Sequence, residues 1–254
     1  MFITGSADGL GRMTARLLVQ EGHQVVLHAR NASRAREAQT GVPQALGVVQ
    51  GDLSSIAETR QVAEEATRLG PFDAVIHNAG VYLLPKRGST PDGLPEVFAI
   101  NTLAPYILTC CMERPKRLVY VSSGMGKSGD ASLRDLTWDQ RRWNASAAYA
   151  DSKLHDVLLA FAVARYWTGV YANAVDPGWV ATKMGGTRAP GTVEEGSATQ
   201  AWLASSADPG ALVSGHYFYH LRETSPHPAA RDQRVQEQLL KECARLSGVN
   251  FPAQ

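Results

Sequence analysis

The sequence lacks the features that mark nucleic-acid-binding, disulfide-rich or metal-binding proteins. Its net charge is +1, from 25 basic and 24 acidic residues, so no excess of positive charge exists to attract a nucleic acid. Of its three cysteines, Cys110 and Cys111 are adjacent, a spacing that suits neither a disulfide framework nor a metal site. We therefore expect no nucleic-acid partner, no metal, and the reduced thiols of a cytoplasmic protein.

Long hydrophobic runs and domain boundaries are also missing. No apolar stretch reaches the ~18 residues that a membrane-spanning helix needs, and no charged leader precedes an apolar core. No repeat, low-complexity tract or long linker divides the 254 residues, of which 44% are hydrophobic. We expect residues 1–254 to form a single domain without a membrane anchor.

What is present is a regular alternation of short apolar runs and longer helical patterns. Most of the runs are continuous rather than alternating, as in a parallel sheet with helices on both faces. The sequence therefore predicts an α/β fold, a Rossmann-type doubly wound parallel sheet of about seven strands. The predicted strands are Phe2–Thr4, Gln24–His28, Leu46–Gln50, Ala74–His77, Arg117–Ser122, Val170–Val175 and Leu212–Tyr219. The predicted helices are Leu10–Glu21, Ile56–Leu69, Leu94–Met112 (kinked or interrupted at Pro105), Ala147–Tyr166, Thr192–Ala204 and a final amphipathic helix over Arg231–Leu246.

A glycine-rich turn joins the first predicted strand to the first helix, with the sequence Thr-Gly-Ser-Ala-Asp-Gly-Leu-Gly over residues 4–11. Glycines let the backbone approach a pyrophosphate closely, and the helix start offers unpaired N–H groups. The turn predicts dinucleotide binding, with a turn that binds no ligand as the alternative. The predicted contacts are Gly5, Ser6, Ala7, Gly9, Leu10 and Gly11.

The end of the second predicted strand indicates which dinucleotide is bound. NAD-binding proteins usually place a carboxylate there for the ribose 2′-hydroxyl, but this segment reads His-Ala-Arg-Asn. Arg30 can pair with a 2′-phosphate. We expect NADP(H) to be preferred, with NAD(H) as the alternative if Arg30 is only a solvent-facing side chain.

Tyr149 and Lys153 lie four residues apart in a predicted helix, so they project from the same face. A fixed cation favours the phenolate of a tyrosine whose ordinary pKa is ~10. The pair predicts proton transfer, and an ordinary surface helix is the alternative. Ser122 and Ser123 close a strand upstream and add two candidate hydroxyls.

Together these motifs resemble the short-chain dehydrogenase/reductase family over nearly the whole chain. Asn-Ala-Gly over residues 78–80 is similar to the family's Asn-Asn-Ala-Gly, with His77 in place of the first Asn. The resemblance implies an adenine contact at Asp52 and a loop along the nicotinamide that begins at Pro177. The cofactor contacts that it implies beyond the glycine turn and Arg30 are Asp52, Leu53, Asn78, Ala79, Gly80, Tyr149, Lys153, Pro177, Gly178, Val180 and Thr182.

The family resemblance also implies a reaction, the interconversion of a carbonyl and an alcohol by hydride exchange. Tyr149 would be the general acid/base, and Ser123 would hold the carbonyl oxygen, with Ser122 as the adjacent alternative. Lys153 would lower the pKa of Tyr149 and bind the nicotinamide ribose. Asn101 would connect Lys153 to solvent through a water, unless its amide only satisfies backbone groups.

Tyr149 follows Ser123 by 26 positions, about twice the interval of many family members. This resembles the retinol dehydrogenase-like branch, as does Ser-Gly-His-Tyr-Phe over residues 214–218. That branch implies a small, hydrophobic aldehyde, ketone or alcohol as substrate. We expect an ordered insertion over residues 124–146 and a substrate-side loop over 184–197, the latter more polar than a lipid-binding lid. The expected substrate contacts are Tyr82, Ser123, Met125, Trp143, Tyr149 and Trp179.

Two other functions share this fold. One is a regulatory protein that senses NADP(H) without turnover, which would not need the serine, tyrosine and lysine together. The other is an epimerase or dehydratase, which usually carries a longer sugar-nucleotide domain. In relatives, the helices matching Leu94–Met112 and Ala147–Tyr166 commonly pair subunits, so we expect a homodimer or homotetramer.

Overall fold

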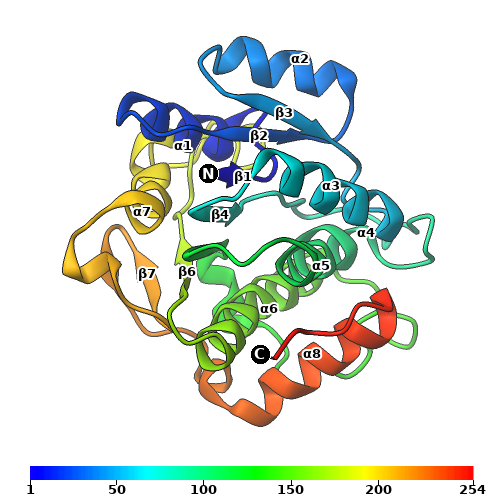
Figure 1. Cartoon of the computed structure of the whole chain (residues 1–254). Coiled ribbons are helices and arrows are strands. Elements are labelled where there is room, and N and C mark those ends of the chain that lie inside the picture. The colour runs from blue at the N-terminus through cyan, green and yellow to red at the C-terminus, as the bar shows by residue number, and fades with distance from the viewer. Residues whose placement is uncertain (254) are drawn as a thin grey trace.

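The alternation of buried strands and helices produces a central sheet covered on both faces (Figure 1). The computed structural model describes residues 1–253. In these residues the strands are β1 (Phe2–Ile3), β2 (Val26–Ala29), β3 (Gly47–Gln50), β4 (Ala74–His77), β5 (Arg117–Val121), β6 (Tyr171–Asp176), β7 (Tyr217–Tyr219) and β8 (Arg222–Glu223). Their order is β3-β2-β1-β4-β5-β6-β7-β8. The first seven are parallel, and β8 pairs antiparallel with β7. The doubly wound parallel sheet is confirmed, with one short strand more than expected.

Successive side chains of each strand point to opposite faces of the sheet, and the core is divided accordingly. Phe2 and Leu118 belong to one buried cluster, whereas their neighbours Ile3 and Val119 belong to the other. The first cluster packs under α3 (Ile56–Leu69), α5 (Ala104–Cys111), α6 (Ala145–Tyr166) and α8 (Gln233–Ser247). The second packs under α1 (Gly9–Gln20), α2 (Ala32–Gly41) and α7 (Val193–Ser205).

The direction of winding reverses between β1 and β4, which are adjacent in the sheet. The connections that leave these two strands go to opposite faces, so a crevice opens outside their carboxyl ends. The glycine turn follows β1, and the segment that begins at Asn78 follows β4. The fold therefore brings both motifs to one edge of the sheet.

Two helical segments differ from the prediction. The helix α2 was not expected, because only Ala35 and Ala38 of its ten residues are buried and its apolar pattern is weak. The helix expected over Leu94–Met112 is divided into α4 (Glu96–Phe98), a π-helical turn η1 (Ala99–Leu103) and α5. The irregular turn ends just before the first turn of α5, where Pro105 can be accommodated.

The C-terminal segment lies over α5 and α6 (Figure 1). The ring of Phe251 stacks on that of Trp167 with centroids 5.6 Å apart, and the indole of Trp167 donates a hydrogen bond to the Pro252 carbonyl at 2.7 Å. The Tyr106 hydroxyl donates to the Val249 carbonyl at 2.8 Å. The apolar faces of the two helices that were expected to pair subunits are thus covered within the chain.

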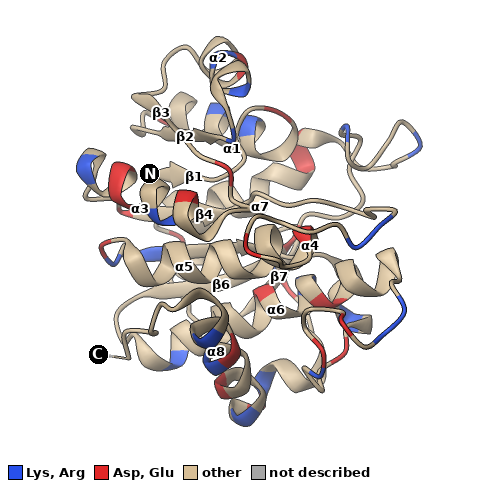
Figure 2. Cartoon of the chain, turned by 90° about the vertical axis from the view of Figure 1, so that its right-hand side faces the viewer, with Lys and Arg blue, Asp and Glu red and all other residues tan. Residues whose placement is uncertain are grey.

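Charged residues of both signs are scattered over the helices and loops (Figure 2). This distribution agrees with the net charge of +1. Among residues 1–253, no helix is both long enough and apolar enough to span a membrane.

Candidate active site

A cavity of about 1110 Å³ lies at the carboxyl ends of the strands. Most residues that the sequence singled out line it: Gly5, Ala7, Gly9, Leu10, Gly11, Arg30, Asp52, Leu53, Asn78, Ala79, Gly80, Tyr82, Ser123, Met125, Tyr149, Lys153, Pro177, Gly178, Trp179, Val180 and Thr182. Three predicted residues, Ser6, Asn101 and Trp143, lie outside this lining. The cavity therefore joins the glycine turn, the β4 loop and the Tyr149–Lys153 helix into one site.

The glycine turn leaves no room for side chains where it packs against the β4 loop. A Cβ on Gly5, whose φ is +62°, would lie 2.8 Å from the Ala79 Cα. A Cβ on Gly11 would lie 2.5 Å from the Asn78 Nδ2. Asp8 occupies the N-cap of α1 but makes no capping hydrogen bond with its side chain. Gly9, Leu10 and Gly11 of this helix start line the cavity, and no side chain caps the helix, an arrangement that fits the phosphates of a dinucleotide.

His28 holds the glycine turn in place, a role that the sequence analysis missed. Its Nδ1 accepts a hydrogen bond from the Gly5 N–H at 3.1 Å, and its Nε2 lies 3.0 Å from the Gly51 carbonyl. Burial lowers the pKa of His28 to about 4, so the ring is neutral with its proton on Nε2. A polar residue within the apolar strand β2 was the available signal. Ser6 has a similar structural role, because its hydroxyl donates to the Ile3 carbonyl at 3.0 Å.

Basic side chains gather at the end of the cavity beyond β2. Arg30 and Arg34 both line it, and Arg34 comes from the first turn of α2. The Arg34 guanidinium pairs with the Asp8 carboxylate at 2.7 Å and also with Glu37. Arg34 was not expected at this site, because its helix α2 was not expected. Two guanidinium groups at this position fit the 2′-phosphate of NADP(H).

The two adjacent serines after β5 face in different directions. Ser122 is buried, and its hydroxyl donates to the Lys153 carbonyl at 2.6 Å, which joins the strand end to α6. Ser123 lines the cavity, and its Oγ accepts a hydrogen bond from the Met125 N–H at 3.3 Å. Since Ser122 uses its proton inside the fold, Ser123 has the hydroxyl that is better placed to meet a ligand.

Tyr149 and Lys153 project from the same side of α6, and the Lys153 Nζ lies 5.7 Å from the centre of the Tyr149 ring. The ammonium donates to the Val121 carbonyl at 2.7 Å and to the Asp156 carboxylate at 2.8 Å. Burial lowers the pKa of Lys153, but Asp156 and Tyr149 outweigh burial and raise it overall. The lysine is therefore a fixed cation beside the phenol.

The phenol of Tyr149 is subject to opposing influences. Burial raises its pKa, Lys153 lowers it, Asp156 raises it again, and the Ser123 hydroxyl lowers it. The net shift is upward. In this structure Tyr149 is thus a protonated phenol, which can donate a proton.

Asn101 lies in the π-helical turn η1 behind the cavity. Its Oδ1 accepts from the Val81 N–H at 2.8 Å, and its Nδ2 donates to the Val81 carbonyl at 3.0 Å and to the Ser152 hydroxyl at 3.0 Å. The side chain therefore joins the β4 loop to α6. This agrees with the alternative in which the amide satisfies backbone groups.

Aromatic and apolar side chains form the wall next to Tyr149. The Tyr82 ring meets the Tyr149 ring edge-to-face at 4.7 Å. Trp179 stands at the rim with 59% of its surface exposed. The Trp143 indole instead donates to the Leu84 carbonyl at 3.0 Å and packs against Trp138, so it supports the wall from behind.

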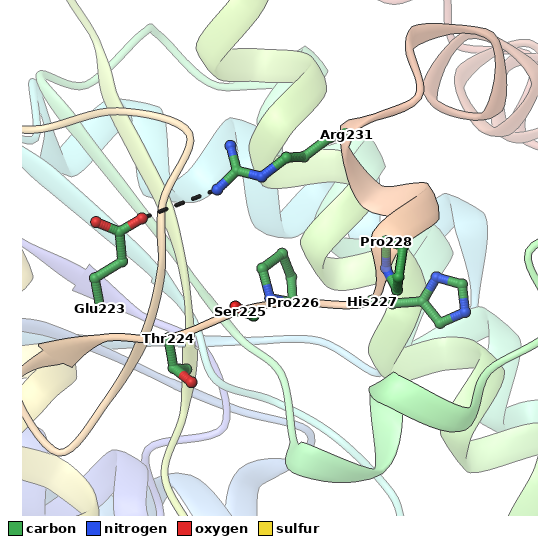
Figure 3. Close-up of a pocket in the computed structure, with 7 residues that line it drawn as sticks. All are labelled: Glu223, Thr224, Ser225, Pro226, His227, Pro228 and Arg231. Carbon is green, nitrogen blue, oxygen red and sulfur yellow. Dashed lines mark ion pairs between the residues drawn. The ribbon is translucent and has the colours of Figure 1, made fainter.

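A second cavity of about 450 Å³ lies between β8 and the 3₁₀ turn over residues 228–231 (Figure 3). Glu223 and Arg231 face one another across it, 3.9 Å apart. None of the residues that the sequence singled out for a site lines this cavity. The larger cavity is therefore the candidate active site.

Known proteins with similar sequences include dehydrogenases and oxidoreductases. A family model described as short chain dehydrogenase matches residues 1–134. A protein of Emericella nidulans described as an uncharacterized oxidoreductase is 48% identical, over 99% of this chain and 98% of the relative. Human retinol dehydrogenase 13 is 30% identical, over 100% of this chain and 86% of the relative.

Among solved structures, an uncharacterized protein from Mycobacterium paratuberculosis superposes with a TM-score of 0.84. It is 26% identical, and the match covers 99% of this chain and 94% of that one. The likeness extends over the whole sheet and its helices.

Proposed function

The chain belongs to the short-chain dehydrogenase/reductase family, in its retinol dehydrogenase-like branch, and we propose that it interconverts a carbonyl and an alcohol with NADP(H). One observation carries the proposal: Ser123, Tyr149 and Lys153 line the same cavity as the glycine turn. A protein that only bound a dinucleotide would need the turn but not the acid–base group beside it.

When bound, the nicotinamide ring of the cofactor supplies a hydride to the substrate carbon or takes one from it. The chain would hold it through the glycine turn, Asp52 with Leu53, the segment from Asn78 to Gly80, and the loop that starts at Pro177. The close contact between Gly5 and Ala79 supports this fit, because a side chain at Gly5 would push the turn away from the β4 loop.

The substrate oxygen is handled by two side chains. In reduction, the Ser123 hydroxyl donates a hydrogen bond to the carbonyl oxygen and polarises it, and Tyr149 gives its phenolic proton to the same oxygen. In oxidation, Tyr149 takes the proton from the alcohol. The ammonium of Lys153 stabilises the phenolate that remains after reduction. Asn101 holds the β4 loop against α6 and so keeps the cavity wall in position.

The preference for NADP(H) is supported by the basic side chains beyond β2 and by the lack of a carboxylate at the strand end. Replacing Arg34 with glutamine should lower kcat/KM with NADPH roughly tenfold to a hundredfold and leave the value with NADH nearly unchanged, because a charge-assisted hydrogen bond contributes about 1.5–3 kcal/mol. Equal losses with both cofactors would contradict this assignment of Arg34.

The substrate we propose is a hydrophobic aldehyde or ketone. The wall that Tyr82, Met125 and Trp179 form beside Tyr149 is aromatic and apolar, and such surfaces bind apolar ligands. Human retinol dehydrogenase 13, whose name refers to an apolar alcohol, is consistent with this class.

The decisive variant is Tyr149→Phe. We expect it to bind NADPH as the native protein does and to lose about 10²–10⁴-fold in carbonyl reduction, which is the usual contribution of a general acid. Tyr171→Phe, in strand β6 and outside the cavity lining, is the matched control and should retain activity. Undiminished turnover by Tyr149→Phe would refute the mechanism.

A panel of aldehydes, ketones and secondary alcohols, tested with both cofactors, distinguishes an enzyme from a sensor of NADP(H). The regulatory alternative requires NADPH binding in the native protein without NADPH oxidation by any member of the panel.

A further inference from the structure

A buried carboxylate lies directly beside the proposed proton-transfer pair. Asp156 is one helical turn beyond Lys153 on α6, and both side chains are almost fully buried. Its Oδ2 accepts a hydrogen bond from the Lys153 Nζ at 2.8 Å. Asp156 has no role in the proposed proton transfer, although burying a charged carboxylate costs free energy of desolvation.

We propose that Asp156 is a positioning residue that holds the Lys153 ammonium and offsets its charge, so that Tyr149 stays a protonated phenol and can donate its proton. This inference rests on the proposed function. The lysine then acts mainly after proton transfer, when a phenolate has formed. The site would thereby be set for carbonyl reduction rather than alcohol oxidation.

The hydrogen bonds of Lys153 support this role. The ammonium donates hydrogen bonds to two acceptors, the Val121 carbonyl on β5 and the Asp156 carboxylate on α6. These two acceptors fix the direction of the lysine side chain. Because one of them is anionic, the ion pair as a whole is neutral when both groups are ionised. The electrostatic potential at Tyr149 then comes from two opposite charges that partly cancel, rather than from a single cation.

The titratable groups around Asp156 come from several elements of the fold. Lys153 and Tyr149 face it from α6, Tyr120 from β5 and Tyr217 from β7. Burial raises the pKa values of Tyr120 and Tyr217, so both are neutral. Asp176, on β6, lines the same cavity as Tyr149 and raises the pKa of Tyr217. Asp156 is a carboxylate that raises the pKa of Tyr149.

Burial also acts on Asp156 itself. It raises the pKa of this carboxyl group to about 6, against the attraction of Lys153. Above that pH the carboxylate is ionised and the offset is present. At the alkaline pH where a tyrosine titrates, the charge of Asp156 is therefore fully developed.

The test is a direct titration of the phenol in the full chain, without cofactor or substrate. The ultraviolet absorbance of tyrosinate is followed with rising pH, and the curve of the matching Tyr149→Phe protein is subtracted to isolate Tyr149. Asp156→Asn keeps the shape and an acceptor for Lys153 but removes the charge. We expect the Tyr149 midpoint to fall by about one pH unit.

The matched control is Asp151→Asn on the same helix. Asp151 is also buried, but it pairs with Arg141 at 3.0 Å, whereas Asp156 pairs with Lys153. Its substitution should leave the Tyr149 midpoint unchanged. An Asp156→Asn midpoint equal to that of the native protein, or above it, would overturn the proposal, since a merely structural role changes stability without moving the titration of the phenol.

If Asp156→Asn does not fold, the effect of Asp156 on Tyr149 is measured in proteins in which Lys153 is replaced by methionine. Lys153→Met/Asp156→Leu replaces the ion pair with apolar side chains, an exchange that is often tolerated in a protein interior. The proposal requires Tyr149 to titrate at lower pH in this double variant than in Lys153→Met alone, and coincident curves would refute it. Because neither titration needs turnover, a failure of the proposed reaction would be seen separately, in the substrate panel.

Discussion

Three histidines are buried in the sheet and its helices, and burial keeps all three neutral. It lowers the pKa of His28 to about 4 and those of His77 and His155 to about 3. His155 bonds to the Thr102 hydroxyl at 3.1 Å through Nδ1, and its Nε2 has no partner in the described structure. Each of these side chains therefore resists protonation in the folded state.

This burial predicts a loss of stability in mild acid. In the unfolded chain a histidine has a pKa of ~6.5. The stabilising contribution is therefore complete above that pH and is lost as the pH falls towards the folded-state pKa values, about 4 for His28 and about 3 for His77 and His155. Asp156 acts in the opposite direction between ~4 and about 6, but with one proton against three. We expect the free energy of unfolding, measured with urea, to fall steadily from pH 7 to pH 5, approaching about 2–3 kcal/mol for each pH unit near the lower limit.

Substitution of one histidine identifies the source of the effect. His155→Gln should reduce the slope near pH 5 by about 1.4 kcal/mol per pH unit, which corresponds to one proton. An unchanged slope in His155→Gln would mean that other groups cause the acid sensitivity.

At this scale the sequence could indicate residues whose role depends on local spacing. Tyr149, Lys153 and the glycine turn are of this kind. It could not indicate Asp156 or Arg34, because their roles come from contacts that only the fold creates. Asp156 reads as an ordinary helix carboxylate until the Lys153 ammonium is found 2.8 Å away.

Among the elements, the segment over residues 124–146 has one arginine, Arg141, that binds both its own carboxylates and α6. Arg141 pairs with the Asp151 carboxylate of α6 at 3.0 Å and lies over the Trp138 ring at 3.8 Å. It also lies within 3.6 Å of carboxylate oxygens of Asp130 and Asp135 in the insertion itself. The insertion is thus joined to the helix that carries Tyr149.

We predict that Arg141→Met loosens this insertion. The change removes the partner of the buried Asp151 and should cost about 1–3 kcal/mol. Hydrogen exchange of the backbone N–H groups over residues 130–144 should become faster. Arg142→Met is the control, because Arg142 is the exposed neighbour, and equal exchange rates in the two variants would contradict the role of Arg141.

Helices and strands were predictable to the extent that their apolar pattern is regular. The parallel strands and α6 follow such patterns. The helix α2 does not, since it buries little beyond two alanines and its start is fixed by Asn31, which accepts a hydrogen bond from the Arg34 N–H. The π-helical turn at Asn101 was also hidden, because it is stabilised by the distant groups of Val81 and Ser152.

At the scale of the whole molecule, the covered faces of α5 and α6 bear on how copies of the chain associate. The expectation of a homodimer or homotetramer assumed that these helices present apolar surface to a partner. Of the 22 residues of α6, the 16 from Ala148 to Val163 are already buried within the chain. The helix α8 and the segment 248–253 pack against α5 and α6. A second subunit would find little apolar area to bury there.

We therefore expect a monomer in dilute solution. Light scattering coupled to size-exclusion chromatography should give a mass close to 27.4 kDa. Phe251→Ala, which removes the ring stacked on Trp167, should destabilise the fold and favour self-association by uncovering this face. A native mass of twice or four times the monomer value would show that another surface pairs the subunits.

The way the C-terminal segment completes the core has a consequence for synthesis on the ribosome. Trp167 is 2% exposed because Phe251 and Pro252 cover it. A nascent chain emerges from its N-terminus, so α5 and α6 leave the exit tunnel well before their cover does. Until residues 248–253 follow, the apolar faces of these helices are open to chaperones and to neighbouring nascent chains. The apolar faces of α5 and α6 can therefore be covered only after residues 248–253 have been synthesised.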